Sequence, residues 1–453
     1  MATMTILGAG LAGLSTAMML HHDGHDVTVL ERDPALPGDR PWDTWQRPGV
    51  NQFRLPHFLL PRWWSALSED LPAAAAELVA AGGTRFLPVP GERRDGDARF
   101  ETVTARRPVV EAALARAAAA AGVTVRRGVR ACGVRLDGAT RVTGVATDQG
   151  VVPADLVIDC SGRRSPMPAW LGERKPVEER DGGGFVYYAR HFRGEMPELR
   201  TVLQQQYESV SLLTLPADNS TWSVVVIASA KDHALRALRD PAVWTALVSR
   251  YPLAAPWIEA APITGVDVMA GIEDRLKHYT ADGAPVVTGM VPVGDAWACT
   301  NPSLGRGAAF TLLHARVLRD VLRDTDPADH DKLARRFHEA TARTMLPLYR
   351  ATNAFDTHRL AEIDGDVTGV PYRPEDPRWI GAKALYAAAQ RDPDMLRAYL
   401  AISSFLETPD EVFARPGLRD RVLALGVSAP QYPLGGCSRA EIVSVCRSAA
   451  TER

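Results

Sequence analysis

The sequence predicts an α/β protein with three parts: a parallel sheet covered by helices, an inserted and mainly antiparallel sheet, and a helical C-terminal region. Three observations predict this fold class. Residues 4–32 follow the order strand, glycine turn, helix and strand, which is how parallel sheets of this class begin. Residues 185–229 contain stretches that alternate apolar and polar side chains, as antiparallel strands do. From residue 308 onward the apolar spacing is mainly helical.

A glycine turn joins the first predicted strand to the first predicted helix. The strand runs into Gly8-x-Gly10-x-x-Gly13. In this pattern Gly8 makes the tight turn, Gly10 lets the backbone approach a pyrophosphate, and Gly13 lets the helix pack close to the strand. The helix begins at Leu11 and Ala12 and points its unpaired N–H groups toward phosphate oxygens. The turn therefore predicts a dinucleotide-binding site.

The second predicted strand ends in an acidic residue. Residues 27–30 are apolar and are followed by Glu31 and Arg32. A carboxylate at this strand end is placed to accept hydrogen bonds from a ribose diol. A glycine pattern alone is a weak signal, but strand, helix, strand and terminal acid together predict a Rossmann-like unit that binds NAD, NADP or FAD.

Composition and charge exclude several classes of protein. The chain has 453 residues, which suggests two or three interleaved domains. Its net charge of −2 provides no general field for nucleic acid or anionic membranes, and no apolar run is long enough to cross a bilayer. The N-terminal residues form a strand and not a signal peptide, and the five scattered cysteines fit reduced thiols. We therefore expect a cytoplasmic protein that binds no nucleic acid and has no membrane span.

Between Arg32 and residue 160 the sequence predicts a loop, helices and short strands. Residues 34–61 are rich in Pro, Trp and Arg and are predicted to form a long structured loop, and such loops are often functional. Arg106 and Arg107 lie just before a helix, because Pro108 is a helix-start signal. The expected elements are helices at 57–71, 73–81 and 109–121, a hairpin of 85–88 with 99–103, a meander of 123–126, 129–136 and 141–147, and a buried strand at 155–159.

The rest of the chain divides into an inserted sheet, a return to the first domain, and a helical end. Strands are expected at 185–192, 201–215, 222–229 and near Val266, with helical segments at 241–251 and 256–260. An apolar strand at 286–293 leads to Gly294 and Asp295, and helices follow at 308–322 and 331–352. The predicted domains are a discontinuous first domain (1–75, 98–180 and 280–350), an inserted sheet domain (181–279, with the 76–97 hairpin packed on it) and a C-terminal helical region (351–453).

Three separated motifs, taken in order, resemble those of the flavin-dependent aromatic hydroxylases and epoxidases, which share the glutathione-reductase-type FAD fold. The glycine turn with Glu31 corresponds to the site for the ADP half of FAD. The stretch Arg106-Arg107-Pro108-Val109-Val110-Glu111 looks like the family's arginine before a helix. Gly294-Asp295 with Asn301-Pro302-Ser303-Leu304-Gly305-Arg306-Gly307 looks like its second flavin motif. The resemblance covers most of the first 350 residues and implies a three-layer ββα FAD-binding domain with an inserted substrate domain.

The resemblance also implies roles for individual residues. Arg107 would reach the flavin phosphates or ring edge, Asp295 would hold the ribityl chain, and the helix after Gly307 would point toward the isoalloxazine. Candidates for the pocket beside the flavin are Arg47, His57, Trp297 and Pro302. The expected cofactor-binding residues are Gly8, Gly10, Leu11, Ala12, Gly13, Glu31, Arg32, Arg47, Arg107, Asp159, Gly162, Gly294, Asp295, Pro302, Gly305, Gly307 and Ala308.

Physical arguments bear on four of these residues without the resemblance. A carboxylate after a buried strand, such as Asp295, needs hydroxyl donors, and its alternative role is a surface helix cap. A cation beside a helix N-terminus, such as Arg107, is disfavoured by the helix dipole, which favours a functional role. His57 either lines the pocket or starts the following helix, and Pro302 either borders the flavin or forms a plain turn.

Two departures from the family pattern concern the electron source. Members that bind NAD(P)H carry an Asp-Gly motif after the strand equivalent to 155–159, whereas this chain has Asp159-Cys160-Ser161-Gly162. Styrene-type epoxidases, similar in the Pro-x-Leu-Gly-x-Gly turn, also lack the motif and receive reduced FAD from a partner reductase. NAD(P)H therefore acts either directly or through a separate flavin reductase. The second departure is Ala308 and Ala309, where the family often has Asn.

The resemblance implies an FAD-dependent monooxygenase that inserts one oxygen atom from O₂ into a small organic substrate, by hydroxylation or epoxidation, in secondary metabolism. In such enzymes reduced flavin and O₂ give a C4a-peroxide, and no obligatory catalytic side chain is required. Tyr187, Tyr207 and Trp222 would roof the pocket, but a one-residue shift of register would invert which of them face it.

Motifs and their spacing also bear on alternative classes of protein. A flavin-dependent dehydrogenase or reductase has the same fold, and a halogenase is disfavoured because its Trp-x-Trp-x-Ile-Pro segment is absent. A non-enzymatic dinucleotide-binding regulator would explain the first motif but not Asp295 with its glycine turn. No metal site is expected, because His21, His22 and His25 lie at the helix-to-strand turn and not together on one helix, and His338 lacks the second histidine of a zinc motif.

Overall fold

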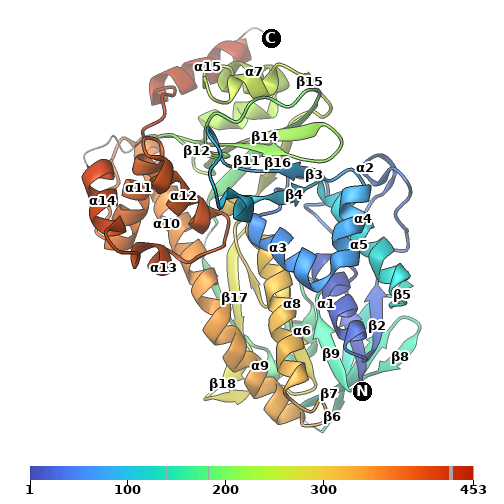
Figure 1. Ribbon diagram of the computed structural model, residues 1–453. Coiled ribbons are helices and arrows are strands. Elements are labelled where there is room, and N and C mark those ends of the chain that lie inside the picture. The colour runs from blue at the N-terminus through green and yellow to red at the C-terminus, as the bar shows by residue number, and fades with distance from the viewer. Residues whose placement is uncertain (139, 182, 428–431, 452–453) are drawn as a thin grey trace.

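The computed structural model of the chain describes residues 1–453 except 139, 182, 428–431 and 452–453. Parts of all three predicted domains therefore lie outside the described residues. Figure 1 shows an elongated molecule with a parallel sheet near the N-terminus, a second sheet at the opposite end, and the C-terminal helices packed on one side. None of the described helices is long and apolar enough to cross a bilayer.

A five-stranded parallel sheet forms the centre of the N-terminal part, in the order β20-β9-β1-β2-β5. Its strands are β1 (Thr3–Leu7), β2 (Asp26–Glu31), β5 (Thr124–Arg127), β9 (Leu156–Asp159) and β20 (Met290–Pro292). Their apolar side chains are buried on both faces, as parallel sheets require. Because β20 lies far along the chain beside β9, this part of the fold is discontinuous in sequence.

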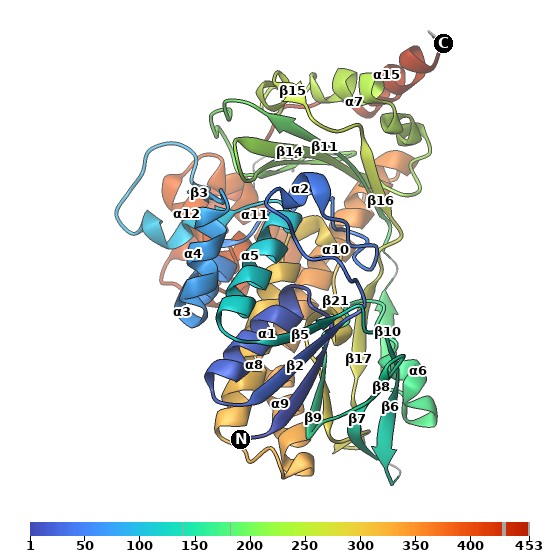
Figure 2. The ribbon, with the colours of Figure 1, turned by 90° about the vertical axis from the view of Figure 1, so that its right-hand side faces the viewer.

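Helices cover one face of the parallel sheet and a small antiparallel sheet covers the other (Figure 2). The helices are α1 (Leu11–His22), α5 (Arg107–Ala120) and α8 (Gly307–Arg323). The small sheet contains β6 (Ala131–Asp137), β7 (Arg141–Thr147) and β8 (Gly150–Pro153). Leu7, Val142, Val145 and Val157 belong to one apolar cluster between the two sheets. This is the three-layer ββα arrangement that the resemblance predicted.

Several predictions about individual elements differ from the structure. Residues 124–127 form β5 at the edge of the parallel sheet, so the predicted meander that began at 123 was wrong. Period-two alternation is common to both sheet types and does not reveal a distant partner. The predicted helix 331–352 is two helices, with Pro347 in the first turn of the second, where its missing N–H is tolerated. Arg107 is the first residue of α5 and does not precede the helix.

A six-stranded sheet, in which β16 and β15 both pair with β11, forms the opposite end of the molecule. Its strands are β11 (Phe185–Arg193), β12 (Gln204–Gln206), β13 (Ser211–Pro216), β14 (Thr221–Ser229), β15 (Ala261–Pro262) and β16 (Asp267–Ala270). The register places Tyr187 on the face that meets the N-terminal part, in the main apolar core. Tyr207 and Trp222 lie in a separate core, with side chains of α7 (Pro241–Val248) and α15 (Arg439–Thr451).

The other elements connect these layers. The predicted hairpin is present as β3 (Thr84–Phe86) with β4 (Thr102–Thr104). The remaining strands are β10 (Val177–Asp181), β17 (Asp274–His278), β18 (Thr280–Ala281), β19 (Ala284–Pro285) and β21 (Ala298–Cys299). The remaining α-helices are α2 (Pro41–Thr44), α3 (Pro61–Asp70), α4 (Pro72–Ala80), α6 (Met167–Trp170), α9 (His330–Thr344), α10 (Leu346–Thr368), α11 (Pro377–Ala389), α12 (Pro393–Ser403), α13 (Pro409–Phe413) and α14 (Leu418–Gly426).

The close packing of α1 on β1 predicts a strong effect of a single methyl group. A Cβ on Gly13 would lie 1.8 Å from the carbonyl oxygen of Gly8, and that backbone atom is held in the turn. We expect Gly13→Ala to lower the free energy of unfolding by about 2 kcal/mol or more. Gly10→Ala is the matched control, because a Cβ there meets nothing within 4 Å. Urea unfolding of both variants checks this, and equal midpoints would contradict it.

Candidate active site

A cavity of about 1380 Å³ lies between the parallel sheet and the six-stranded sheet. Leu7, Glu31 and Cys160 line it at the carboxyl ends of β1, β2 and β9, which is where open α/β sheets bind ligands. Ala189, Leu213 and other residues of the six-stranded sheet line the opposite wall. Its volume exceeds the 300–1,000 Å³ typical of ligand pockets. The cavity is therefore large enough for a dinucleotide together with a second, smaller molecule.

Most of the predicted cofactor-binding residues meet at this cavity, although they come from six separate segments of the chain. Those that line it are Gly8, Gly10, Leu11, Ala12, Glu31, Arg32, Arg47, Arg107, Gly162, Asp295, Pro302, Gly305, Gly307 and Ala308. His57, a pocket candidate, also lines it. Four of the predicted site residues do not line the cavity: Gly13, Asp159, Gly294 and Trp297. The folded chain thus assembles one site from motifs that are far apart in sequence.

Two helices begin at the cavity with free N-terminal amides. The first turns of α1 and α8 contribute Leu11, Ala12, Gly307 and Ala308 to the wall. Among the described residues, no side chain caps either helix. Uncapped helix N-termini attract anions, because their N–H groups and the helix dipole both favour negative charge. The cavity therefore has two positions suited to phosphate oxygens or to developing negative charge.

Asp295 supplies a carboxylate without hydrogen-bond donors. It is half-buried, lines the cavity, and accepts no hydrogen bond from the described residues. Burial raises the pKa of the Asp295 carboxyl, while Arg107, Lys277 and Arg163 act in the opposite direction. A buried carboxylate in this state is costly unless a ligand provides hydroxyl or amide donors. Asp295 therefore lines the cavity as an acceptor that no described residue uses, and it does not cap a surface helix.

The turn that carries Asp295 is held by a histidine that the sequence did not indicate. The Gly294 N–H donates to His314 Nδ1 at 3.1 Å, and Gly294 has a positive φ of 65°. His314 is fully buried on α8, and burial lowers its pKa to about 3. A neutral imidazole is required here, because the accepting nitrogen must be unprotonated. Its position on the buried face of α8 gave no signal of this contact.

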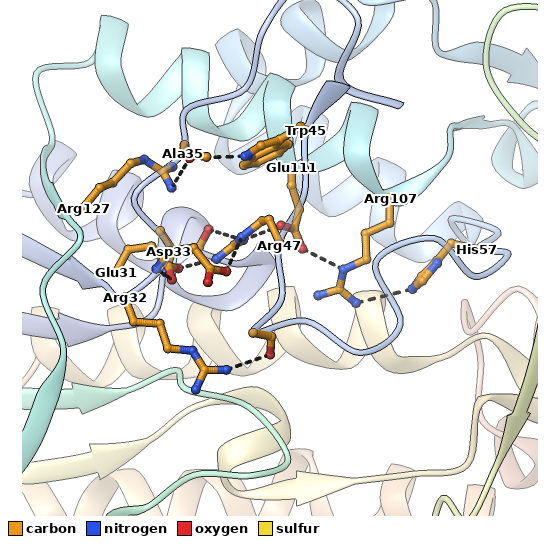
Figure 3. Close-up of polar contacts among 12 residues, drawn as sticks. Glu31, Arg32, Asp33, Ala35, Trp45, Arg47, His57, Arg107, Glu111 and Arg127 are labelled. Atoms are coloured by element: carbon orange, nitrogen blue, oxygen red, sulfur yellow. Dashed lines mark hydrogen bonds and ion pairs between the residues drawn. The ribbon is translucent and has the colours of Figure 1, made fainter. Parts of the chain in front are cut away.

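Arg47 is buried among three carboxylates (Figure 3). Its guanidinium contacts Glu31 and Glu111, lies 3.4 Å from Asp33, and donates to the carbonyl oxygen of Ala9 at 3.0 Å. Burial lowers the pKa of Arg47, but Glu111 and the other carboxylates raise it more, so the net shift is upward. Burial likewise raises the pKa of Glu111, and Arg107 and Arg47 reverse this shift. The network joins the end of β2, the 34–61 loop and α5.

The predicted ribose acid, Glu31, is engaged by the protein itself. Its carboxylate accepts from the N–H groups of Ala9 at 2.8 Å and Asp33 at 2.9 Å, and it pairs with Arg47. Only 4% of its side chain is exposed. A ribose at this position would have to share Glu31 with Arg47.

Arg107 and His57 extend this network, and both line the cavity (Figure 3). Arg107 donates from Nε to Glu111 at 2.7 Å, and one of its terminal nitrogens lies 3.4 Å from His57 Nε2. His57 Nδ1 lies 2.9 Å from the carbonyl oxygen of Leu55 and must therefore carry the proton. Burial, together with the charge of Arg107, lowers the pKa of His57 to about 4. His57 is thus a neutral cavity residue, and α3 begins only at Pro61.

Two predicted site residues, Asp159 and Trp297, lie outside the cavity lining and contact other groups of the protein. Asp159 is fully buried, and its carboxylate accepts from the Ser161 N–H at 3.0 Å and from the hydroxyls of Ser161 and Ser165. Its donors all come from the turn after β9, so the carboxylate holds that turn. Trp297 packs 4.9 Å from the ring of His314 in the core behind the cavity.

Arg106 is a site-forming residue whose partner the sequence did not reveal. Its backbone N–H, Nε and a terminal nitrogen all donate to Asp218, at 2.7, 3.0 and 2.6 Å. Asp218 lies between β13 and β14, so this pair joins the N-terminus of α5 to the six-stranded sheet. Arg106 also lies 4.3 Å over the ring of Trp42 in the 34–61 loop. The pair fixes the distance between the two walls of the cavity.

Comparisons with known proteins agree with this geometry. Residues 6–76 match the family described as NAD(P)-binding Rossmann-like domain, and residues 48–171 match the family described as Tryptophan halogenase. Protein Rv3254 of Mycobacterium tuberculosis is 29% identical over 460 residues, which cover 89% of each chain. PqsL, a probable FAD-dependent monooxygenase from Pseudomonas aeruginosa, is 18% identical with a TM-score of 0.63, covering 82% of this chain and 99% of its own.

A halogenase has a similar fold. The flavin-dependent halogenase CmlS is 17% identical with a TM-score of 0.58, and the match covers 100% of this chain and 77% of CmlS. The predicted FAD-binding monooxygenase fold is therefore confirmed. The family matches and the structural matches together indicate a flavin-dependent oxidoreductase, and they include oxygenases and halogenases alike.

Removal of Arg47 is expected to destabilise the protein strongly. Arg47→Ala leaves Glu31 and Glu111 buried without their shared cation, and breaking such a pair costs about 3–5 kcal/mol. Arg32→Ala is the control, because Arg32 is exposed and donates only to the carbonyl oxygen of Gly49 among the described residues. Chemical unfolding at neutral pH measures both. A loss below about 1 kcal/mol for Arg47→Ala would contradict the network as described.

The lowered pKa of His57 predicts that the stability of the protein depends on pH. Its folded-state pKa of about 4 lies below the ordinary value of 6.5, so the unfolded chain takes up the proton first as the pH falls. Stability is therefore lost between about pH 6.5 and pH 4. In His57→Gln we expect this loss to be smaller by about 1–2 kcal/mol. Urea unfolding across that range checks it, with His22→Gln, whose side chain is 86% exposed, as the control. Identical pH profiles for His57→Gln and the wild type would rule the effect out.

Proposed function

We propose that the protein is an FAD-dependent monooxygenase that inserts one oxygen atom from O₂ into a small organic substrate, by hydroxylation or epoxidation. The observation that carries this proposal is Asp295, a cavity carboxylate without donors among the described residues, beside the uncapped first turn of α8. Hydroxyls of a ribityl chain would supply the missing donors. The size of the cavity and the confirmed fold support the same cofactor.

The residues of the chain fit the separate parts of FAD. The Gly8–Gly13 turn and the first amides of α1 would hold the pyrophosphate, since Gly10 leaves open space on the cavity side. Asp295 would hold the ribityl chain. The turn at Gly305 and Gly307 and the positive end of α8 would stabilise negative charge at the flavin ring. When bound, FAD supplies the redox chemistry that activates O₂.

The protein's own contributions are electrostatic and steric. Arg107 lies at the cavity with Glu111 and His57, and it would place a positive charge near the flavin phosphates or ring edge. His57 remains neutral and adds no charge beside it. The apolar wall formed by Ala189, Leu213 and Val225 would exclude water from the reacting atoms.

The turn after β9 bears on the source of electrons. The Asp159 carboxylate is committed to Ser161 and Ser165, and Cys160 separates it from Gly162. This arrangement favours reduction by a separate flavin reductase over direct reduction by NAD(P)H. O₂, a small organic substrate and that reductase would then be the partners of the enzyme.

Halogenation is the second candidate, and a specific observation favours it. Residues 48–171, which include part of the 34–61 loop and the start of α5, match the tryptophan halogenase family. The Trp-x-Trp-x-Ile-Pro segment is nevertheless absent from the chain. Product analysis in the presence of bromide or chloride separates the two reactions, because only a halogenase leaves the halogen on the product.

The cofactor proposal predicts a binding defect at Asp295. We expect Asp295→Ala to weaken FAD binding about tenfold or more, because the ribityl hydroxyls lose a charged acceptor. Asp137→Ala, at an exposed acid of β6, is the control and should bind FAD like the wild type. Titration of the apoprotein with FAD, followed by flavin fluorescence, measures the dissociation constants. A wild-type protein that binds no flavin would overturn the proposal.

The reaction is tested on the FAD-loaded protein. Anaerobic titration with NADH and NADPH, with and without an added flavin reductase, shows how the flavin is reduced. Oxygen uptake against a panel of alkenes and phenols, with mass analysis of the products, shows whether one oxygen atom is inserted. Flavin reduction coupled to substrate oxidation without oxygen insertion would indicate a dehydrogenase instead.

A further inference from the structure

The register of the six-stranded sheet places one transverse row of side chains on the cavity. Asp267 of β16 pairs with Ala189 of β11, Ala189 with Val225 of β14, Val225 with Leu213 of β13, and Leu213 with Gln204 of β12. All five residues line the cavity. Because paired residues project from the same face and neighbouring strands lie 4.7–4.9 Å apart, the row spans roughly 19 Å.

The middle of this row is apolar and its two ends are polar. Ala189, Val225 and Leu213 are buried, with exposures of 1%, 3% and 8%. Among the described residues, no charged side chain from β11 to β14 or from α12 lines the cavity. A flat apolar molecule would fit under the three central residues, whereas a carboxylate there would lose its hydration without gaining a cation.

Among the described residues, the arginines that line the cavity all come from segments outside the six-stranded sheet: Arg32, Arg47, Arg54, Arg107, Arg130, Arg163 and Arg164. Arg47 is surrounded by carboxylates, and Arg107 is bound to Glu111 and near His57. Arg163 donates to the carbonyl oxygen of Gly271 at 3.4 Å. Gly271 directly follows β16, and Asp267 is the first residue of that strand. Gly271 and Asp267 are four residues apart, which corresponds to roughly 13 Å along an extended strand. The cations of the cavity thus come from parts of the chain other than the strands of the six-stranded sheet.

Asp267 is the exception on the sheet wall. Its side chain is half-buried, and among the described residues it has neither a hydrogen bond nor an ion pair. Burial raises the pKa of the Asp267 carboxyl, and no neighbouring charge offsets this. The Asp267 carboxyl can therefore accept a hydrogen bond from a ligand at one end of the apolar surface. When ionised, its negative charge would repel an anionic ligand.

From this arrangement we propose the substrate class of the site, an inference that rests on the proposed function. The substrate is an uncharged, flat and mainly apolar molecule that lies under Ala189, Val225 and Leu213 and donates a hydroxyl hydrogen bond to Asp267. Carboxylates of the same shape are excluded, because the sheet wall offers them no cation. Asp267 acts as a specificity-determining residue for the substrate.

Matched aromatic ligands test this proposal by binding alone. FAD content is measured first, so that a failure of the cofactor proposal is recognised separately. Equilibrium dialysis of the oxidised, FAD-loaded protein then compares 2-naphthol, 2-naphthoate and naphthalene, without reductant and therefore without turnover. We expect 2-naphthol to bind at least about tenfold more tightly than 2-naphthoate. Equal binding of the two, tighter binding of 2-naphthoate, or no binding of either neutral compound overturns the inference.

Two variants separate the roles of the row. Asp267→Ala is expected to weaken 2-naphthol about tenfold and to leave naphthalene unchanged, and Glu195→Ala, at an exposed acid after β11, should change neither. Gln204→Arg, at the other end of the row, is expected to increase the affinity for 2-naphthoate. If Asp267→Ala weakens 2-naphthol and naphthalene equally, Asp267 shapes the wall and does not accept the hydroxyl, and the proposal is wrong.

Discussion

The burial of Arg47 among Glu31, Asp33 and Glu111 is the constraint on which the site depends. Charges removed from water are tolerated only when their partners are in place, so the end of β2, the 34–61 loop and α5 must come together in one arrangement. That arrangement positions Arg107 and His57 at the cavity. The Arg106 and Asp218 pair extends the same restraint to the six-stranded sheet. Two ionic contacts thus set the positions of the two walls relative to each other.

The fold and half of the site could be predicted because their signals are local in sequence. The glycine turn, Glu31, Asp295 and the helix after Gly307 are short patterns with a direct physical meaning, and most of these residues reach the cavity. The features that could not be predicted depend on contacts between residues far apart in the sequence. Arg106 and Asp218 are 112 residues apart, and β5 joins a strand nearly a hundred residues upstream. Neither relation leaves a trace in local periodicity.

The sequence also does not reveal which face of the inserted sheet meets the cavity. Tyr187, Tyr207 and Trp222 were equal candidates for the roof, because alternation alone leaves two registers open. The pairing of β11 with β14 and β16 decides between them and brings Asp267 to the cavity. Trp297 was misplaced for a related reason: its proximity to Asp295 in sequence is not proximity to the cavity, since the intervening turn directs its ring into the core.

A further part of the cavity wall has a separate origin, since Tyr399, Leu400 and Ser403 belong to α12 and Ser404 follows it directly. This helix is attached to the body of the protein by the Arg397 and Asp97 pair, away from the glycine turns and from Asp295. In the proposed function the substrate would meet the six-stranded sheet and α12, whereas FAD would meet the glycine turns and Asp295, so different stretches of the chain would form the two surfaces. On that proposal, substitutions in α12 would alter which molecules fit the cavity and would leave the residues proposed to hold FAD in place.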